Sequence, residues 1–357
     1  MASRNRLEDL VDVPKLTAWL DDNIPALGDA PLKVELIHGG TTNVILSLNR
    51  GLKTLILRRP PAVPPPGSER TVLREARVLA ALNGTNVPHP ECFGSCADAT
   101  LIGAPFYVME LVPGWAPQLR DEKIHNNPPF DRMPYEYRIP FAVVDGLVAL
   151  ANVDYKAVGL ADFGKPDNFL ERQVDRWSSQ LASYGKLYNY AGRALPGYEV
   201  TEKWLRANTP KTFKAGIIHG DVGTPNMLFA PDPPARLTAL IDWELSTIGD
   251  PLLDLAWFCN SLRDERSADH SPVKSHYHVE NWPTRQELLR YYCAGTGRDV
   301  SNFDYYLLLA RFKAGCILEY KVAQAEAGML SKETGAFFSR IVLKTFEEAA
   351  EMIRSIG

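Results

Sequence analysis

This chain of 357 residues has few cysteines, little excess of either charge and no long apolar run. The five cysteines include no Cys-x-x-Cys pair, so neither a disulfide framework nor a zinc site is expected, and the expected compartment is the reducing cytoplasm. The 39 basic residues nearly balance the 43 acidic ones, for a net charge of −4, so nucleic acid is not an expected partner. No run reaches the roughly 18 apolar residues of a membrane span, and acidic residues interrupt the N-terminal segment, unlike a signal peptide. A membrane is therefore not expected as a partner either.

The length and the spacing of apolar residues predict two lobes. A chain this long exceeds one small core, and its 45% hydrophobic content is typical of a globular protein. Helical spacing predicts two short helices within residues 1–25, with Pro14 opening the second. Alternation then predicts three antiparallel strands within 33–59, a helix over 68–84 and a buried strand that stops at Pro113-Gly114. Residues 1–112 should therefore form a small β-rich lobe.

Residues 113–357 are expected to form a larger, mainly helical lobe after a polar loop over 113–138, so the fold class is α+β. The hinge between the lobes is expected at Pro113-Gly114. Short strands are expected in the segments AGIIHGD, NMLFA and LTALIDWE. Helices are expected over 139–151, 168–190, 198–207, 250–262, 302–329 and 331–356.

The turn between the first two predicted strands is a candidate phosphate-binding segment. It consists of Gly39, Gly40, Thr41, Thr42 and Asn43. Small residues let a backbone approach a phosphate, and exposed N–H groups and hydroxyls can hold its oxygens. A plain hairpin turn is the alternative, and it is the more frequent origin of such a sequence taken alone.

Arg58 on the third predicted strand and Glu75 in the following helix form a candidate pair. Strand alternation puts Arg58 and Ile56 on one face and Leu57 and Arg59 on the other. A cation there could hold two phosphates while an acid fixes the cation. The alternative is a pair of surface residues that form an ordinary ion pair.

The segment from His219 through Gly220 and Asp221 to Asn226 carries the strongest chemical signal. Asp221 could accept a proton from a substrate hydroxyl, and Asn226 could turn its amide oxygen to a magnesium ion. A turn capped by Asp and Asn is the alternative, but apolar flanking strands favour burial, where an unpaired Asp is costly. Asp242 ends the strand one hairpin later, so it can face the same ion. The alternative is that Asp242 only caps a turn.

Two further acids follow Asp242. Asp250 precedes Pro251 at a helix start and is expected to cap that helix or to brace the preceding loop. Asp254, one helical turn on, is expected to be structural rather than catalytic.

The order of these segments resembles that of protein-kinase-like phosphotransferases, and most of all the aminoglycoside phosphotransferase (APH, or phosphotransferase-enzyme) family. The set H-G-D-x-x-x-x-N, D-W-E and G-D-P is specific, and the resemblance covers about residues 30–260. The segments LRRPP, GAPFYVMELVPG, GLADFGKPDNFLERQVDRW and DWELSTIGDPLLDLAW are similar to the branch of kinase domains fused to some acyl-CoA dehydrogenases. The resemblance implies a two-lobe kinase-like fold with ATP and Mg²⁺ between the lobes.

The resemblance also implies roles for single residues. Asp221 matches the catalytic base, His219 the residue that braces its loop, and Asn226 and Asp242 the metal ligands. Glu75 matches the helix acid that fixes the strand cation. Most of the catalysis would then be positioning and electrostatic stabilisation.

The backbone of Glu110 and Val112, in the last strand before the hinge, would bond adenine if the resemblance holds. Three departures limit the likeness. Arg58 stands where most kinases have Lys, and its planar guanidinium binds phosphate differently from an ammonium. The turn reads GGTTN rather than G-x-G-x-x-G, and Ala151 stands where many relatives have His.

The expected activity is transfer of the ATP γ-phosphate to a small-molecule hydroxyl, and two acceptor classes stay open. Aminoglycosides would need an acidic cleft, for which the candidates are Asp121, Glu122, Asp131 and Glu136, in a loop that also holds four basic residues. A hydroxyacyl thioester would need basic residues beside an apolar channel, for which Arg172 and Arg176 next to Trp177 are candidates. The alternatives are a solvated loop in the first case and a helix ion-pair network with Glu171 and Asp175 in the second.

A nucleotide-binding pseudokinase or regulatory module is the alternative from another class. Its signature would be loss of Asp221, Asn226 or Asp242, and all three are present. The sequence leaves the acceptor and the oligomeric state open.

Overall fold

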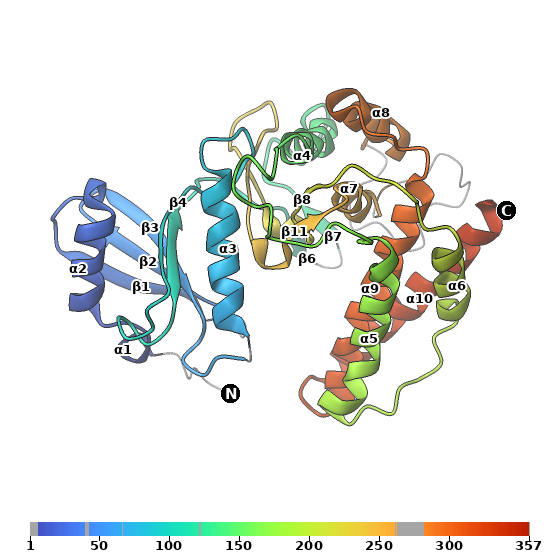
Figure 1. The fold of residues 1–357 in the computed structure, drawn as a ribbon, viewed down its shortest axis with the longest axis horizontal. Coiled ribbons are helices and arrows are strands. Elements are labelled where there is room, and N and C mark those ends of the chain that lie inside the picture. The colour runs from blue at the N-terminus through green and yellow to red at the C-terminus, as the bar shows by residue number, and fades with distance from the viewer. Residues whose placement is uncertain are drawn as a thin grey trace.

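The computed structural model describes residues 6–39, 43–65, 67–120, 123–260, 262 and 282–356. Its architecture is the expected α+β, with a β-rich N-terminal part joined to a larger part made mostly of helices (Figure 1). In Figure 1 helix α2 (Val13–Asn23) lies on one side of the N-terminal sheet, and helix α3 (Ser68–Leu82) lies on the other side, between that sheet and the helical part.

Five antiparallel strands form the main sheet, in the order β1-β2-β3-β5-β4. The bounds are β1 Leu32–Gly39, β2 Val44–Arg50, β3 Lys53–Arg59, β4 Cys92–Cys96 and β5 Phe106–Glu110. The four expected strands are confirmed, whereas β4 was not predicted, because the sequence Cys-Phe-Gly-Ser-Cys is poor in strand-forming residues. Arg58 pairs with Ile45 of β2 on one side and Tyr107 of β5 on the other, which places it in the central strand.

Three helices belong to this part: α1 (Leu7–Leu10), α2 (Val13–Asn23) and α3 (Ser68–Leu82). The two-piece N-terminal helix is confirmed, with Pro14 in the first turn of α2 and Asp12 accepting a hydrogen bond from the Lys15 N–H at 3.1 Å. Leu16 and Leu20 of α2 share a core with one face of the sheet.

Helix α3 packs into a different core from α2. Val72 and Leu79 of α3 belong to the large apolar cluster that continues through the helical part of the molecule. The helix also contacts the short 3₁₀ segment η3 (Trp243–Leu245), which follows the strand that precedes Asp242. The division of the chain at residues 112/113 into two domains stays a prediction, since α3 joins the two parts.

Seven helices of the described chain follow the hinge. They are α4 (Tyr135–Ala151), α5 (Glu171–Tyr188), α6 (Tyr198–Ala207), α7 (Leu252–Cys259), α8 (Arg285–Thr296), α9 (Phe303–Glu326) and α10 (Lys332–Ile356). All but α8 were expected, and α4 begins earlier than expected. Asp250 lies just before Pro251, the N-cap of α7, and its carboxylate accepts from the Leu252 N–H at 3.1 Å and from the Tyr306 hydroxyl at 2.6 Å. Helix α9 is largely buried, because α5, α7 and α10 pack around it.

Short strands connect these helices. The expected polar loop contains the unpredicted hairpin of β6 (Gln118–Arg120) and β7 (Lys123–His125). The expected strands are β8 (Gly216–Ile218), β9 (Met227–Phe229) and β10 (Leu237–Leu240), and the unpredicted β11 (Thr247–Gly249) pairs with β8. The 3₁₀ segment η2 (Thr224–Asn226) precedes β9, which pairs with β10.

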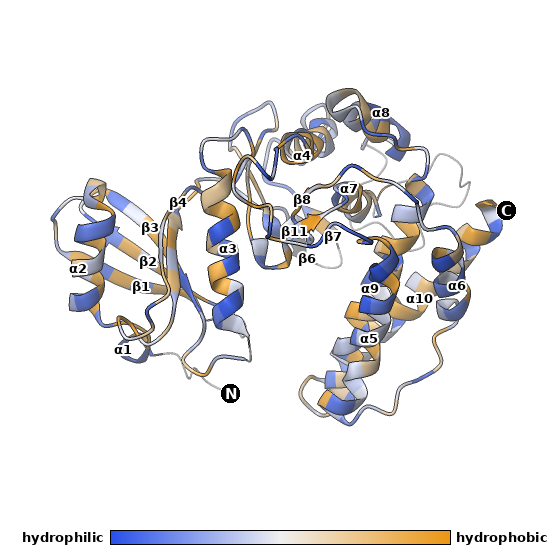
Figure 2. Cartoon of the chain, in the orientation of Figure 1, coloured by the Kyte–Doolittle hydropathy of each residue, from blue (hydrophilic) through white to orange (hydrophobic). Residues whose placement is uncertain are grey.

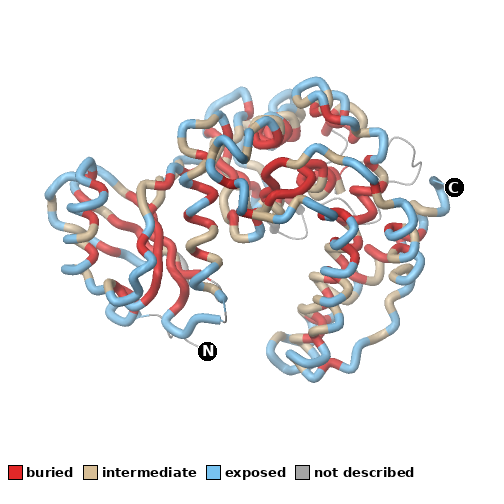
Figure 3. The backbone as a smooth tube through the Cα atoms, in the orientation of Figure 1, coloured by how far each residue is buried: buried red, intermediate tan, exposed pale blue. Residues whose placement is uncertain are grey.

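Hydropathy and burial follow the same plan. Figure 2 shows helices such as α3 and α5 with apolar residues on one side and polar residues on the other, which is typical of helices at the edge of a core. Figure 3 shows a buried backbone around β8 and β11, where the loops of the candidate site begin. None of the described helices is both long and apolar enough to cross a membrane.

Candidate active site

The loop after β8 is held by a buried carboxylate from α7. The backbone N–H groups of His219 and Gly220 donate to the two Asp254 oxygens at 2.6 and 2.8 Å. Gly220 has a φ of +89°, and a Cβ there would meet the Leu245 carbonyl oxygen at 2.7 Å, so glycine is required. Burial raises the pKa of Asp254 to about 6, although both N–H groups oppose that shift. Asp254 thus fixes the loop that leads to Asp221.

His219 is buried and joins this loop to the end of β10. Its Nε2 donates to the Ile241 carbonyl at 3.0 Å, and its Nδ1 accepts from the Asp221 N–H at 3.2 Å. Burial lowers the pKa of His219 to about 4, so the ring is neutral at physiological pH, as this hydrogen-bond pattern requires. The ring also packs against Trp243, with centroids 4.6 Å apart. These contacts are those of a residue that positions a loop.

Asp221 and Asn226 lie at the two ends of the segment between β8 and β9. The Asn226 side-chain NH₂ donates to an Asp221 carboxylate oxygen and to the Asp221 backbone carbonyl, both at 3.0 Å. The Asn226 amide oxygen is therefore the atom of this side chain that a cation could use. Burial raises the pKa of Asp221, Lys313 opposes that shift, and Asp242 adds to it.

Asp242 follows β10 and lies near Asn226, because the Ile241 N–H donates to the Asn226 carbonyl at 2.9 Å. Its φ of +67° is in the left-handed region, which is uncommon outside glycine and concentrates at functional sites. One carboxylate oxygen of Asp242 lies 2.7 Å from Arg58, and the side chain is 36% exposed. The other oxygen can face a ligand from that exposed side.

Arg58 is buried in β3 and surrounded by acids. Its guanidinium nitrogens lie 2.9 Å from Glu75, 2.7 Å from Asp242 and 3.7 Å from Glu244. Burial lowers the pKa of Arg58, but Glu75 and Asp242 outweigh burial and raise the pKa overall. Burial raises the pKa of Glu75 to about 7, and its carboxylate also accepts from the Trp243 N–H at 3.0 Å. The expected contact between Arg58 and Glu75 is present, and it is a buried link rather than a surface ion pair.

Glu244 was missed at the sequence level, although it stands beside Asp242 in the D-W-E segment. Its carboxylate accepts a hydrogen bond from the Asn43 side chain at 3.4 Å, so the end of the predicted phosphate-binding turn lies beside the Arg58 cluster. Gly39 ends β1. The other residues of that turn lie outside the described residues: Gly40, Thr41 and Thr42.

The hinge residues Glu110 and Val112 line an open cavity of about 770 Å³ between the end of β5 and α4. The Glu110 N–H donates to the Glu91 carbonyl at 2.9 Å, so it is committed within the protein. A contact between this backbone and adenine stays a prediction.

The structure describes two of the four acids proposed for an aminoglycoside cleft. Glu136 is buried in the first turn of α4, whereas Asp131 is exposed. Asp121 and Glu122 lie outside the described residues.

The expected ion-pair network along α5 does not form in the described chain. Arg172 donates to the backbone carbonyls of Asp167 and Lys165, and Asp175 pairs with Arg206 of α6 at 2.8 Å. Arg176 packs instead over the Trp177 ring, 4.7 Å from its centre. Both arginines are therefore held by contacts that the helix spacing did not predict.

Lys313 on α9 is a second residue of the site region that sequence reasoning missed. It donates to the Gly220 carbonyl, directly before Asp221, and its ammonium lies 4.2 Å from the centre of the Trp257 ring. Burial lowers the pKa of Lys313 to about 8, whereas Asp221 and Asp254 raise it. The available signal was a lone lysine among apolar residues in the segment LLLARFKAGCILEY.

Across the described ranges, no group of three or more His, Cys, Asp or Glu side chains could hold a metal ion by itself. Asn226 and Asp242 offer one amide oxygen and one carboxylate. That donor set fits Mg²⁺ that arrives with phosphate oxygens and water, since Mg²⁺ is typically held by one or two carboxylates plus substrate phosphates.

Solved structures that share this arrangement of sheet and helices include kinase-like phosphotransferases. A crystal structure from Ralstonia eutropha, named as a candidate aminoglycoside phosphotransferase, matches with a TM-score of 0.78 at 28% identity, covering 96% of this chain and 98% of that one. The choline kinase of Cryptosporidium parvum shares the fold with a TM-score of 0.62 at 14% identity, covering 97% and 96% of the two chains. The expected kinase-like fold class is confirmed.

The chain belongs to the phosphotransferase enzyme family (APH), whose sequence model matches residues 33–288. The human protein named acyl-CoA dehydrogenase family member 11 is 29% identical over 351 residues, which are 96% of this chain and 43% of that protein. The chain thus spans less than half the length of this relative. The expected family and the expected likeness to acyl-CoA dehydrogenase-linked proteins are confirmed.

Proposed function

We propose that this protein transfers the γ-phosphate of ATP, with Mg²⁺, to a hydroxyl group of a small molecule. The observation that carries the proposal is the convergence of Asp221, Asn226 and Asp242 beside the buried pair of Arg58 and Glu75. Membership of the phosphotransferase enzyme family supports a kinase-like enzyme.

Asp221 is the residue assigned to the acceptor hydroxyl. The Asn226 NH₂ group holds one of its carboxylate oxygens, so the other would orient the hydroxyl and take its proton. Burial raises the pKa of Asp221, which makes its carboxylate a stronger base than one in water. His219 and Asp254 would act through the loop backbone, holding Asp221 in place.

Asn226 and Asp242 are assigned to Mg²⁺, which would neutralise charge on the β- and γ-phosphates when bound. Asp242 would keep one oxygen on Arg58 and offer the other to the ion. Arg58, with the turn that ends at Asn43, would face the triphosphate, and Glu75 would fix Arg58. At the hinge, the backbone of Val112 and the carbonyl of Glu110 are assigned to adenine, since the Glu110 N–H already donates to the Glu91 carbonyl.

Two acceptor classes remain within this proposal. The name of the Ralstonia eutropha structure supports an aminoglycoside-like acceptor. The likeness to acyl-CoA dehydrogenase family member 11 supports a hydroxyacyl-type acceptor.

The test is Mg-ATP binding followed by an ATP-consumption screen. Thermal unfolding with and without Mg-ATP would measure binding, and the screen would compare aminoglycosides, hydroxyacyl thioesters, choline-like alcohols and sugars. We expect Mg-ATP to raise the Tm and one class of alcohol to be phosphorylated. Asp242→Asn should lose most of the Mg-ATP shift, whereas Asp232→Asn, an exposed acid in the β9–β10 turn, should keep it.

Two results would count against the proposal. A Tm that does not respond to Mg-ATP would exclude the assigned nucleotide site. Binding without turnover across the whole panel would favour a nucleotide-binding regulatory module instead.

A further inference from the structure

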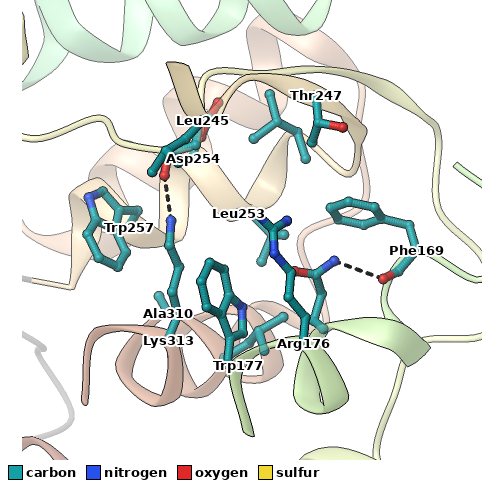
Figure 4. A pocket seen from close by; sticks show the side chains of 14 residues that line it. Phe169, Arg176, Trp177, Leu245, Thr247, Leu253, Asp254, Trp257, Ala310 and Lys313 are labelled. Carbon is teal, nitrogen blue, oxygen red and sulfur yellow. Dashed lines mark hydrogen bonds between the residues drawn. The ribbon is translucent and has the colours of Figure 1, made fainter. Parts of the chain in front are cut away.

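A small cavity lies beside the loop that carries Asp221, between α5, α7 and α9 (Figure 4). Its volume is about 40 Å³, which is room for roughly three water-sized groups. Gly220 and Asp254 line the cavity on the side of the loop, and so does Trp257, whose side chain lies beside the Asp221 carboxylate. A group bound in this cavity would therefore lie next to the proposed base.

Two cations from different helices line the cavity, Lys313 from α9 and Arg176 from α5 (Figure 4). Each rests on an aromatic ring: the Lys313 ammonium lies 4.2 Å from the centre of Trp257, and the Arg176 guanidinium 4.7 Å from that of Trp177. These contacts hold the side chains without neutralising their charges. Among the described residues, no carboxylate lies within ion-pair distance of either cation.

The acids nearest to this pair are already engaged. Both oxygens of Asp254 accept backbone hydrogen bonds from the loop. Asp175, next to Arg176 in sequence, pairs with Arg206. Burial lowers the pKa values of Arg176 and Lys313; Asp221 and Asp254 oppose that shift at Lys313, and Arg176 adds to it by a smaller amount. Arg176, whose side chain is exposed, therefore faces the cavity without a paired acid, whereas Asp221 and Asp254 partly offset the charge of Lys313.

An open cavity of about 460 Å³ adjoins the small one. Arg176 and Phe169 line both, so they stand where the two meet. Lys165 and Arg172 add further basic residues to the open part, and Asp175, which pairs with Arg206, also lines it. The two cavities make a groove that runs from solvent to the loop before Asp221, with Arg176 midway; we call it the α5 groove.

We infer that the α5 groove binds the acceptor of the proposed phosphotransfer, and that this acceptor carries an oxyanion, a carboxylate or a phosphate, held by Arg176. The inference rests on the proposed function for its link to catalysis. The apolar part of such an acceptor would lie against Trp177 and Trp257, with its hydroxyl toward Asp221. Lys313 would add positive charge at the loop end of the groove. A polycation such as an aminoglycoside would meet two like charges there.

The test compares small anions with neutral molecules of similar size. Dissociation constants from ligand-observed NMR titration would be measured for 3-hydroxybutyrate against 1,3-butanediol and for glycerol 3-phosphate against glycerol. At least one anion should bind about fivefold or more tightly than its neutral partner, and added salt should weaken it. The two arms distinguish a carboxylate from a phosphate as the recognised group.

Variants locate the binding. Arg176→Met should reduce the affinity of the preferred anion about fivefold, towards that of its neutral partner. Lys186→Met removes the same charge from an exposed position on the same helix, outside both cavities, and should change nothing. Arg176→Lys should recover part of the loss. The inference is overturned if neither anion binds better than its neutral partner, or if the Met variants at 176 and 186 behave alike.

The outcomes separate this inference from the proposed function. Anion binding that depends on Arg176, without phosphorylation of any hydroxyl, would keep the anion site and reject the phosphotransferase. Turnover of neutral or cationic alcohols, unaffected by Arg176→Met, would keep the phosphotransferase and reject the anion site.

Discussion

Two cationic clusters lie near Asp221, and they are built in opposite ways. Arg58 is surrounded by three carboxylates, at 2.7, 2.9 and 3.7 Å. Arg176 and Lys313 rest on tryptophan rings, with no carboxylate of the described chain within ion-pair distance. The surrounding acids raise the pKa of Arg58 overall, whereas burial lowers the pKa values of Arg176 and Lys313.

The difference separates a cation whose charge is balanced by adjacent carboxylates from cations without a carboxylate at ion-pair distance. The charge of Arg58 is neutralised inside the protein, and its planar fork joins β3 to α3 and to the segment after β10. The charges of Arg176 and Lys313 are directed into the α5 groove. We therefore expect changes at Arg58 to affect folding first and changes in the groove to affect ligand binding first.

The largest effect should come from removing the neutralised cation. Arg58→Met would leave Glu75 and Asp242 facing each other without a positive charge, and removing one partner of a buried pair costs about 3–5 kcal/mol. Chemical denaturation would measure the loss, with Arg58→Lys expected to be intermediate because it keeps the charge but not the two-sided contact. If the free energy of unfolding of Arg58→Met lies within about 1 kcal/mol of wild type, the proposed difference between the two clusters is wrong.

A smaller effect is expected where a carboxylate fixes the loop without facing a cation at short range. Asp254→Asn replaces an acceptor by a donor opposite a backbone N–H, which should lower the free energy of unfolding by about 1–3 kcal/mol. Turnover should fall while Mg-ATP affinity changes little, because Asp254 positions Asp221 and contacts neither proposed metal ligand. Asp232→Asn serves as the surface control, and equal effects from both variants would contradict the bracing role.

Affinity in the α5 groove should depend on pH through Lys313. Burial lowers the pKa of Lys313 to about 8, opposed by Asp221 and Asp254 and assisted by Arg176, so its positive charge is lost as pH rises through about 8. We expect the dissociation constant of the preferred anion to rise a few-fold between pH 7 and 9.5. Anion titrations across this range would measure it.

The sign for stability is opposite to that for binding. The unfolded chain binds more protons than the folded one between about pH 8 and 10.5, so this group makes the free energy of unfolding rise with pH there. Lys313→Met should remove both dependences. Lys313→Arg should keep anion binding at high pH, and a wild-type affinity that does not change across the range would show that Lys313 does not act in the groove.

The smallest effect on stability is expected at the third carboxylate of the Arg58 cluster. Glu244 lies 3.7 Å from Arg58 and its side chain is 29% exposed, so Glu244→Gln should change the free energy of unfolding by less than about 1 kcal/mol. Denaturation beside Glu75→Gln, whose side chain is 1% exposed, gives the matched comparison. If both variants lose the same free energy of unfolding, burial does not determine how much each acid around Arg58 contributes to stability.

Much of the fold could be predicted because its longer elements carry strong periodicity. The strands over 33–59 and the helices α3 and α10 have it, whereas β4 contains Gly and Ser and β11 is only three residues long. Helix α8 was missed although Thr284 and Glu287 form the capping box that marks its start. The hairpin of β6 and β7 was not predicted, because its sequence is polar and lacks the alternation of a strand.

The two clusters also differ in how far the sequence could predict them. The order of motifs along the chain identifies the first cluster, because Arg58 and Asp242 lie at strand ends and Glu75 lies in the helix after β3. The catalytic roles of these residues stay predictions. Arg176 and Lys313 meet only because particular faces of α5, α7 and α9 pack together, and helix spacing does not specify which faces meet. The sequence offered Arg176 beside Trp177 as one candidate, without a partner on α9.

Both clusters have a function in this account only if Asp221 lies between a bound nucleotide and a bound acceptor. The most direct measurement is phosphorus NMR of wild type and Asp221→Asn with Mg-ATP and the acceptor panel, together with the Mg-ATP dissociation constant of each. The account predicts a phosphomonoester signal that grows as ADP forms in wild type, at least about 100-fold slower growth in the variant, and similar Mg-ATP affinities. The same product formed at the same rate by Asp221→Asn, or no binding of Mg-ATP by wild type, would contradict it.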